Sequence, residues 1–242
     1  FVDNSKAYDT VDSAEVFGKS GKAFGRFQKY LSDFPAESLS EIIKNFHNTI
    51  WRYENEFIPA VQADKADRAV NCGEEIKFVM HRREDCKKLV EFIEKGKLPL
   101  RVTHNDTKLN NVLFDSDSDD AICVIDLDTV MPGLALYDFG DSIRFGANSC
   151  AEDDDNYDKV ELMLDYFEAY AKGFLSEAGD ALNQCEIDNL AFSAKLMTFE
   201  CGMRFLTDYL NGDTYFKTAY PEHNLVRAKN QIALVADMER KM

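Results

Sequence analysis

The amino-acid sequence predicts a mostly helical α+β protein in which one small β-hairpin region interrupts a helical body. Apolar residues recur at intervals of three and four over most of the chain, which is the spacing of one helix face. Only the middle, about residues 98–128, contains short β-branched and aromatic runs separated by polar turns. With 242 residues, 45% of them hydrophobic, and no internal repeat, the sequence predicts a single domain over residues 1–242.

The part before the hairpin region predicts four helices after a polar, irregular stretch at residues 1–12. Asp12 or Ser13 can cap the first helix, and Pro35 ends it. Its apolar stripe consists of Phe17, Phe24, Phe27, Leu31 and Phe34. The other three helices are expected over residues 36–45, 51–70 and 74–95, the last of them stopped by Gly96.

Three strands are expected in the hairpin region. Residues 98–103 form the first, and residues 112–114 and 121–125 form two more, joined by the acidic turn 115–120. After Pro132 and Gly133 the chain returns to helical spacing. The helices of this part are expected over residues 137–145, 157–178, 186–210 and 223–241.

Charge and composition exclude several classes of partner. The chain carries 28 basic and 44 acidic residues, a formal net charge of −16, and therefore repels nucleic-acid phosphates and anionic lipids. No apolar run approaches the ~18 residues of a membrane span. No secretory leader begins the sequence, so we expect a cytoplasmic protein. The six cysteines lack metal-site and disulfide spacing and are expected to be reduced core residues.

Two stretches resemble ligand-binding motifs but lack a required residue. Gly18–Ser20 ends like a phosphate-binding loop, yet Ser13 stands where the first glycine is required and the segment has a helical stripe. The carboxylates of residues 115–126 have the spacing of a calcium loop, but Asp120 replaces the glycine of its sharp turn. We expect a close-packed helix at the first and a solvated hairpin tip at the second.

Residues His104–Asn111 define the candidate site. They fit the pattern H-x-D-x-K-x-x-N of phosphotransferase catalytic loops, and Asp126 follows at the end of an apolar strand. Phosphoryl transfer to a hydroxyl needs a carboxylate that accepts the hydroxyl proton, and oxygen ligands for Mg²⁺. A tight loop between two strands can bring Asp106, Asn111 and Asp126 around one point. The spacing therefore predicts a kinase-like site.

Several neighbours of this loop have secondary roles. Asp138–Gly140 spells the metal-binding triplet of protein kinases, but it follows a Pro-Gly turn and opens a helix. Asp138 is therefore expected to be a helix cap or a loop brace, and Asp126 the metal ligand. Asp128 can hold a second Mg²⁺ or brace the loop. His104 is expected to bond backbone near Asp126. Lys108 either reaches the transferring phosphate or is an exposed loop lysine.

One cation lies beside the apolar stripe of the helix predicted over residues 186–210. That stripe consists of Ile187, Leu190, Ala194, Met197, Cys201 and Phe205, and Arg204 adjoins it. A guanidinium near an apolar face must find acceptors. Spacing alone favours a structural ion pair for Arg204 over a ligand contact.

These residues together resemble the aminoglycoside phosphotransferase/choline kinase superfamily. The resemblance rests on His104–Asn111, Ile125–Asp128 and Asp138. Three further stretches are similar to the bacterial N-acetylhexosamine 1-kinases of that superfamily, namely Gly21–Gln28, Phe46–Thr49 and Arg204–Asp213. The likeness covers nearly the whole chain, and the last stretch is the more specific one.

The resemblance implies the C-terminal lobe of a protein-kinase-like fold, with the catalytic loop carried by the hairpin region. It implies Mg²⁺- and ATP-dependent phosphorylation of the anomeric hydroxyl of N-acetylglucosamine or N-acetylgalactosamine. By similarity Asp106 is the base, and Asn111 and Asp126 are the metal ligands. Arg204 becomes a sugar contact rather than a structural residue. Weaker sugar-side candidates, with packing or helix capping as equal alternatives, are Tyr215, His47 and Asn48.

The sequence departs from this family at its start. Family members have an N-terminal β lobe with a phosphate-covering loop and a lysine that binds the α- and β-phosphates. The sequence, which begins at Phe1, has no such segment before its first helix, so we expect the C-terminal lobe alone, inactive or weakly active by itself. Two alternatives to the sugar kinase are a choline- or aminoglycoside-type kinase, which the acidic charge suits, and a non-catalytic binding module. The sequence does not decide the sugar epimer or the oligomeric state.

Overall fold

A computed structural model describes residues 2–11 and 13–242, and it divides into two compact units. The first unit contains the described parts of Phe1–Lys44, Gly96–Ala147 and Met163–Ala194. The second unit contains Asn45–Lys95, Asn148–Leu162 and Lys195–Met242. The expectation of a mostly helical chain with few strands is confirmed. One domain can consist of two such units, so the single domain over residues 1–242 stays a prediction.

The strands of the first unit form two small antiparallel sheets. Strands β1 (Ser5–Lys6), β3 (Val112–Asp115) and β4 (Ala121–Val124) form one sheet in the order β1-β3-β4. Strands β2 (Arg101–Thr103) and β5 (Met131–Gly133) form the other, with Val102 opposite Pro132. The hairpin of β3 and β4 was predicted. The sequence did not predict β1 and β5, because strands of two or three residues are too short to show alternation.

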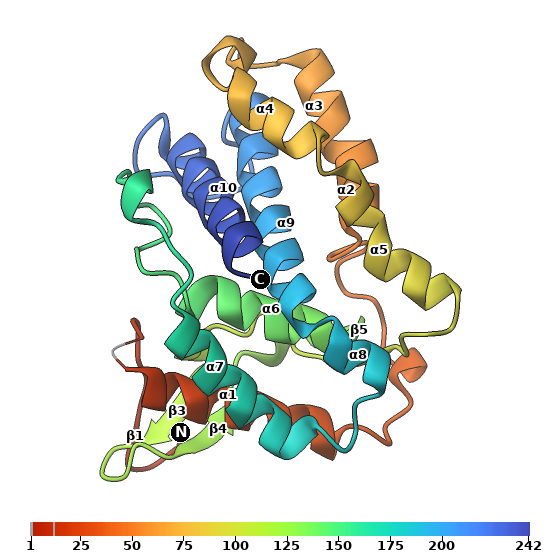
Figure 1. The fold of residues 1–242 in the computed structure, drawn as a ribbon, viewed down its shortest axis with the longest axis vertical. Helices are drawn as coiled ribbons and strands as arrows, with labels where there is room; N and C mark the ends of the chain where they lie inside the picture. Colours follow the sequence, from red (N-terminus) through yellow and green to blue (C-terminus); the bar gives the residue numbers. More distant parts are fainter. Residues whose placement is uncertain (1, 12) are drawn as a thin grey trace. The chain divides into compact units, whose positions relative to one another are not determined.

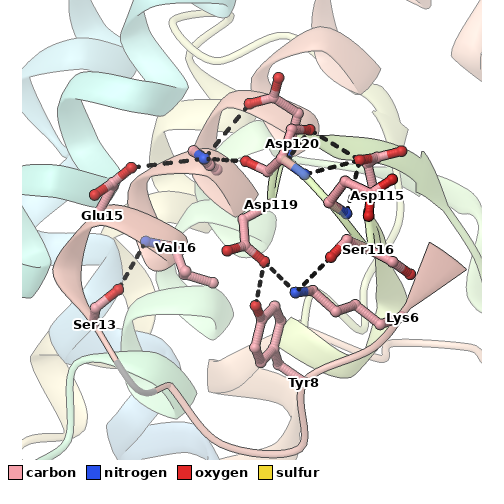
Figure 2. Close-up of polar contacts among 12 residues, drawn as sticks. Lys6, Tyr8, Ser13, Glu15, Val16, Asp115, Ser116, Asp119 and Asp120 are labelled. Carbon is pink, nitrogen blue, oxygen red and sulfur yellow. Dashed lines mark hydrogen bonds and ion pairs between the residues drawn. The ribbon is translucent and has the colours of Figure 1, made fainter. Parts of the chain in front are cut away.

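Figure 2 shows how the N-terminal segment is bound to the acidic turn between β3 and β4. Asp119 accepts a hydrogen bond from the hydroxyl of Tyr8 and forms an ion pair of 2.6 Å with Lys6. Asp115 accepts backbone N–H groups of the turn, which lowers the pKa of its carboxyl. Lys19 lies 3.6 Å from Asp120. The turn at residues 115–120 is therefore the hairpin tip that the sequence predicts.

The helices of the first unit are α1 (Ala14–Tyr30), α6 (Ala135–Gly146), α7 (Leu164–Ala178) and α8 (Gln184–Asp188). Ser13 caps α1, since its hydroxyl accepts the N–H of Val16 at 3.2 Å; the other predicted cap, Asp12, and the first residue, Phe1, lie outside the described residues. Helices α1 and α7 run side by side (Figure 1). A Cβ atom on Gly173 of α7 would collide with the Gly18 carbonyl of α1. Gly18 thus serves close helix packing, as predicted for residues 18–20, and not a phosphate loop; Gly21 and Gly25 also face backbone atoms of α7 closely.

The second unit is helical. Its helices are α2 (Thr49–Arg52), α3 (Ile58–Ala63), α4 (Gly73–Met80), α5 (Arg83–Glu94), α10 (His223–Lys241) and most of α9 (Leu190–Asn211). A π-helical turn over Tyr53–Phe57 joins α2 to α3. Helix α10 has the bounds that the sequence predicts. No helix among the described residues has the length and hydrophobicity that crossing a membrane requires.

Two helices before the hairpin region are shorter than predicted. The expected helix over residues 36–45 is wrong: only a 3-10 turn, Ala36–Ser38, forms there. The expected helix over residues 51–70 ends at Asp64, which has a left-handed backbone. The Asp64 carboxylate accepts the N–H groups of Arg68 and Ala69 at 2.8 and 3.0 Å. These local bonds compete with the backbone bonds of a helix, which is a common effect of aspartate side chains.

Two further predicted helices are interrupted, and a third begins late. The range 74–95 is broken at Arg82, whose guanidinium binds the carbonyl of Phe78 at 3.0 Å. The range 186–210 is broken at Asn189, whose amide binds the carbonyl of Cys185 at 2.7 Å. Helix α7 begins seven residues after the predicted start at Tyr157. In each interrupted helix a polar side chain takes a backbone partner that the periodicity of apolar residues does not reveal.

Candidate active site

The catalytic loop predicted over His104–Asn111 connects β2 to β3 in the first unit. Asp106 is half-buried, and its carboxylate lies 2.8 Å from Nζ of Lys108 and 3.2 Å from Nδ2 of Asn111. The same Nδ2 donates to the backbone carbonyl of Asp106 at 2.8 Å. The structure thus brings together the predicted base, the predicted lysine and one predicted metal ligand.

Asn105 bends the loop just before Asp106. Its φ of 64° lies in the left-handed region, which asparagine tolerates better than most residues. Its buried amide donates to the carbonyls of Thr103 and Thr129 at 3.1 and 3.0 Å and accepts the hydroxyl of Thr103 at 3.0 Å. Asn105 was not among the predicted site residues. Its place inside the motif is the only sequence signal that points to it.

The carboxylate of Asp138, on α6, binds backbone N–H groups at the start of the catalytic loop. Its carboxylate accepts the N–H groups of His104 and Asn105 at 2.9 and 2.8 Å. Gln28 of α1 donates to it at 2.8 Å. Burial raises the pKa of Asp138, and these donors oppose the rise only in part. Of the two predicted alternatives, helix cap or loop brace, these bonds match the loop brace.

Phe139, which follows Asp138, belongs to the core of the first unit. Its ring is fully buried and meets the rings of Phe167, Tyr170 and Phe174 edge-on at 5.4–5.9 Å. Asp138 itself has no exposed surface. The triplet Asp138–Gly140 is therefore part of a packed helix, which leaves Asp126 as the candidate metal ligand, as predicted from the spacing.

His104 connects the catalytic loop to the end of β4. Its Nε2 lies 2.9 Å from the carbonyl oxygen of Ile125, the residue before Asp126, and this is the bond that the sequence predicts. Its ring meets Phe24 and Phe27 of α1 edge-on at 5.6 and 5.9 Å. A histidine enclosed in this way fixes the distance between the catalytic loop and the end of β4.

Lys108 is paired with the base. Burial lowers the pKa of Lys108, but its ion pair with Asp106 outweighs that effect and raises the pKa. The ammonium group therefore stays charged at neutral pH. Lys108 thus places a positive charge 2.8 Å from the carboxylate of Asp106.

The residues predicted to bind Mg²⁺ fit that ion by their chemistry. Asn111 donates through its Nδ2 within the loop, and its Oδ1 accepts no hydrogen bond from the described residues. Asp126 is exposed, has φ 60°, and makes no hydrogen bond within residues 2–11 and 13–242. The N–H of Ile125 donates to the Asn111 carbonyl at 2.9 Å, so the two ligands are close in the fold. Such oxygen donors, completed by water and phosphate, are typical of Mg²⁺.

Other acidic residues add less to this site. Asp128 is exposed in the 3-10 turn Leu127–Thr129. The described residues contain no group of three or more His, Cys, Asp or Glu side chains arranged to hold a metal. The structure therefore favours neither predicted alternative for Asp128.

The predicted substrate residues all lie in the second unit. The guanidinium of Arg204, on α9, lies 5.2 Å from the ring centre of Phe46, 5.8 Å from that of Tyr215 and 5.4 Å from that of Phe216. These are cation–π distances. Spacing alone favoured an ion pair for Arg204, whereas the structure surrounds its guanidinium with aromatic rings.

His47 and Asn48 hold the chain that leads into α2. His47 Nδ1 lies 2.8 Å from the buried carboxylate of Glu200, which also accepts the hydroxyl of Thr49 at 2.6 Å. Asn48 caps α2 by accepting the N–H of Trp51 at 3.1 Å. These bonds match the capping alternative for Asn48, and a substrate contact of either residue stays a prediction.

Comparison with known proteins gives the family. A model of the phosphotransferase enzyme family (APH) matches residues 2–173. The chain belongs to this family. Among solved structures, an ethanolamine kinase from Plasmodium vivax is similar to 96% of this chain, with a TM-score of 0.57 and 15% identity. The chain spans 63% of the length of that kinase.

These matches confirm the kinase-like fold and the superfamily that the catalytic loop indicated. At 15% identity the likeness to the Plasmodium vivax kinase demonstrates a common fold. The closer likeness to N-acetylhexosamine 1-kinases and the assignment to a C-terminal lobe stay predictions.

Proposed function

We propose that the protein is a small-molecule kinase that transfers the γ-phosphate of ATP to a hydroxyl group. The observation that carries this proposal is the pairing of Asp106 with Asn111 and Lys108 in a loop whose backbone Asp138 holds. Family membership supports the same reaction class. The proposal includes ATP as the co-substrate and a cytoplasmic location, both of which are inferred from the sequence.

The reaction uses Asp106 as the proton acceptor. The acceptor oxygen attacks the γ-phosphorus, an O–P bond forms, and the bond from that phosphorus to the β,γ-bridging oxygen breaks, with its electron pair leaving on ADP. The hydroxyl proton passes to the Asp106 carboxylate. Lys108 supplies a positive charge beside this exchange. Mg²⁺, which Asn111 and Asp126 would hold, neutralises phosphate charge when bound.

For the acceptor, the comparisons favour the amino-alcohol and aminoglycoside class over the N-acetylated sugar. The family description names phosphotransferases in general, and the similar solved structure is an ethanolamine kinase. The net charge of −16 attracts a cationic acceptor to the protein. Our first candidate for the acceptor is therefore a primary alcohol that carries an amine or quaternary ammonium group.

One observation favours the N-acetylhexosamine reading as a second candidate. The three rings around Arg204 already face a permanent cation, so a second cation there would meet charge repulsion. The N–H groups of Arg204 have no hydrogen-bond acceptor among the described residues and suit hydroxyl or carbonyl oxygens. A neutral sugar offers both kinds of oxygen.

The proposal is tested by replacing Asp106, the proposed base, in the natural protein. Asp106→Asn keeps the size of the side chain but cannot accept the proton, so we expect transfer to fall by about 10²–10⁴-fold. The control is Asp180→Asn, an exposed aspartate of the same unit. Undiminished turnover in the Asp106→Asn protein would remove Asp106 from the reaction.

A substrate panel separates the candidates. Ethanolamine, choline, an aminoglycoside, N-acetylglucosamine and N-acetylgalactosamine are each offered with MgATP, and ADP release is followed. Turnover of amines alone supports the first candidate, and turnover of the two sugars alone supports the second. A protein that turns over none of them and binds no MgATP by calorimetry is a binding module, which would refute the kinase proposal.

A further inference from the structure

We propose that Glu200 and Asp208 are positioning residues that hold two chain segments against Arg204. The three residues are spaced by four on α9, so they lie along one face of the helix. Glu200 is 1% exposed and Asp208 is 4% exposed. Two buried acids on either side of a cation require partners, and each finds them in a different segment of the second unit.

Asp208 holds the loop that follows α9. One carboxylate oxygen accepts the N–H groups of Thr214 and Tyr215, both at 2.9 Å, and the other accepts the N–H of Phe216 at 2.9 Å. Asn224 of α10 donates to the same carboxylate at 2.9 Å. Three consecutive N–H groups converging on one anion fix the backbone of this loop. The backbone that carries Tyr215 and Phe216 is therefore held in place.

A second aspartate reinforces this arrangement. Asp213 has a left-handed backbone with φ 60° and forms an ion pair of 2.6 Å with Arg68. Asn224 donates to Asp213 at 2.9 Å as well as to Asp208. The amide of Asn224 thus joins the two carboxylates, and the turn after α9 is fixed at both ends.

Glu200 holds the segment before α2 in the same manner. Its carboxylate accepts the hydroxyl of Thr49 and faces Nδ1 of His47, so it binds the residues that directly follow Phe46. Although burial raises the pKa of Glu200, the nearby His47 and the guanidinium groups of Arg52 and Arg204 bring it below its usual value. Glu200 is therefore an anion that both attracts Arg204 and anchors the segment bearing Phe46.

Arg204 is consequently enclosed by rings that it does not itself fix. Cation–π contacts leave the guanidinium N–H groups free in the plane of the group, and none of them has an acceptor among the described residues. Rings held in place in advance reduce the entropy lost when a ligand orders the site. The two carboxylates thus prepare Arg204 to bind an acceptor oxygen. This inference rests on the proposed function, because it takes Arg204 as an acceptor contact.

The first test is hydrogen exchange in the natural protein, which needs no activity. In Asp208→Asn we expect the amides of residues 214–216 to exchange about tenfold faster or more, because their shared acceptor is lost. In Glu200→Gln we expect the same for residues 46–49. The matched controls are Asp237→Asn, a 4% exposed aspartate of the second unit that accepts the N–H of Leu162, and Glu186→Gln, a 1% exposed glutamate of the first unit.

The second test separates positioning from mere stability. Asp208→Asn is expected to raise KM for the acceptor about tenfold, the order of the cost of ordering two aromatic side chains, with KM for ATP unchanged. Asn224→Ala, which removes one donor and keeps both acids, is the variant to use if Asp208→Asn does not fold. It is expected to give a smaller change in the same direction.

Either of two results overturns the inference. Unchanged exchange at residues 214–216 in folded Asp208→Asn would mean that the carboxylate does not hold the loop. Faster exchange at residues 214–216 with an unchanged KM for the acceptor would mean that the Asp208 carboxylate holds the loop but that the loop does not affect acceptor binding. If the unmodified protein phosphorylates no acceptor, the proposed function fails, while the exchange measurement still decides whether these acids hold the two segments.

Discussion

Asp138 in the first unit and Asp208 in the second both hold the backbone of a loop, but they differ in how far along the sequence that loop lies. Each is a buried carboxylate on a helix, and each accepts successive backbone N–H groups of a loop. Asp138 binds residues 33 and 34 positions away, whereas Asp208 binds residues six to eight positions away. The catalytic loop thus depends on the whole first unit, and the loop beside Arg204 is nearly self-contained.

The buried carboxylates also differ in their electrostatic surroundings. Asp138 is surrounded by neutral donors, and burial raises its pKa. Glu200 is equally buried, but its pKa is lowered by His47 and two arginines, which outweigh the effect of burial. A buried acid is held charged by cations more firmly than by N–H groups alone. At similar burial, the direction of the pKa shift of a carboxylate therefore depends on its partners.

The largest expected effect comes from removing the long-range brace. Asp138→Ala leaves the N–H groups of His104 and Asn105 without an acceptor inside the first unit. At roughly 1–3 kcal/mol for each unsatisfied group, the free energy of unfolding should fall by about 2–6 kcal/mol. Urea denaturation measures it. Exposed Asp180→Ala is the control, expected within about 0.5 kcal/mol of the unmodified protein. Equal losses in both variants would contradict the assigned brace.

A smaller effect is expected from the helix contacts, in which the two units also differ. Gly173→Ala places a methyl group against the Gly18 carbonyl, so α1 and α7 must separate, at a cost of about 1–3 kcal/mol. In the second unit a Cβ on Gly202 would meet the Cβ of Gln231 at 3.0 Å, a milder contact.

Denaturation of the alanine variants checks this order. Gly73, whose Cβ position is open, is the control. We expect Gly173→Ala to lose the most stability, Gly202→Ala less, and Gly73→Ala almost none. A Gly202→Ala variant less stable than Gly173→Ala would reverse the comparison.

The smallest effect is a difference in pH dependence between Asp138 and Glu200. A lowered pKa gives stability that is present above the ordinary value of 4.5 and is lost as pH falls. A raised pKa gives stability that is largest below the ordinary value of 3.8 and declines as pH rises through the folded-state pKa. The destabilisation by Glu200→Gln should therefore shrink on acidification, and that by Asp138→Asn should shrink as pH rises.

These opposite slopes are measured by denaturation of both variants and the unmodified protein between about pH 2.5 and pH 7. Each variant serves as the control for the other, because both replace an acid by its amide. Parallel pH profiles would mean that the partners of the two acids do not set their ionisation.

Local patterns account for most of what the sequence predicted correctly. Helix α10 keeps its predicted bounds, and Ser13 caps α1, since periodicity and capping act within a few residues. The hairpin of β3 and β4 follows from two β-rich runs around an acidic turn. The prediction of a helix over residues 36–45 was wrong, and the next predicted helix ends early because the Asp64 carboxylate takes backbone N–H groups that compete with helix formation.

The candidate site was predictable only in part for the same reason. The motif from His104 to Asn111 indicated the base, the lysine and one metal ligand. Asn105, Glu200 and Asp208 were missed, because a buried acid or amide in a sequence looks like any other polar residue. Asn105 lies inside the motif and Asp208 lies in the Arg204–Asp213 stretch, so each had a signal that could have directed attention to it, whereas Glu200 had none.

The sequence by itself determined the superfamily and the mostly helical class, and it indicated candidate residues for the chemistry, since these depend on spacing within short segments. Only the tertiary structure decided which groups hold them. Asp138 binds the catalytic loop from 33 and 34 positions away, Gln28 binds Asp138 across 110 positions, and Glu200 meets His47 across 153 positions. A buried carboxylate is stable only where donors converge on it, and which donors converge depends on how distant segments pack.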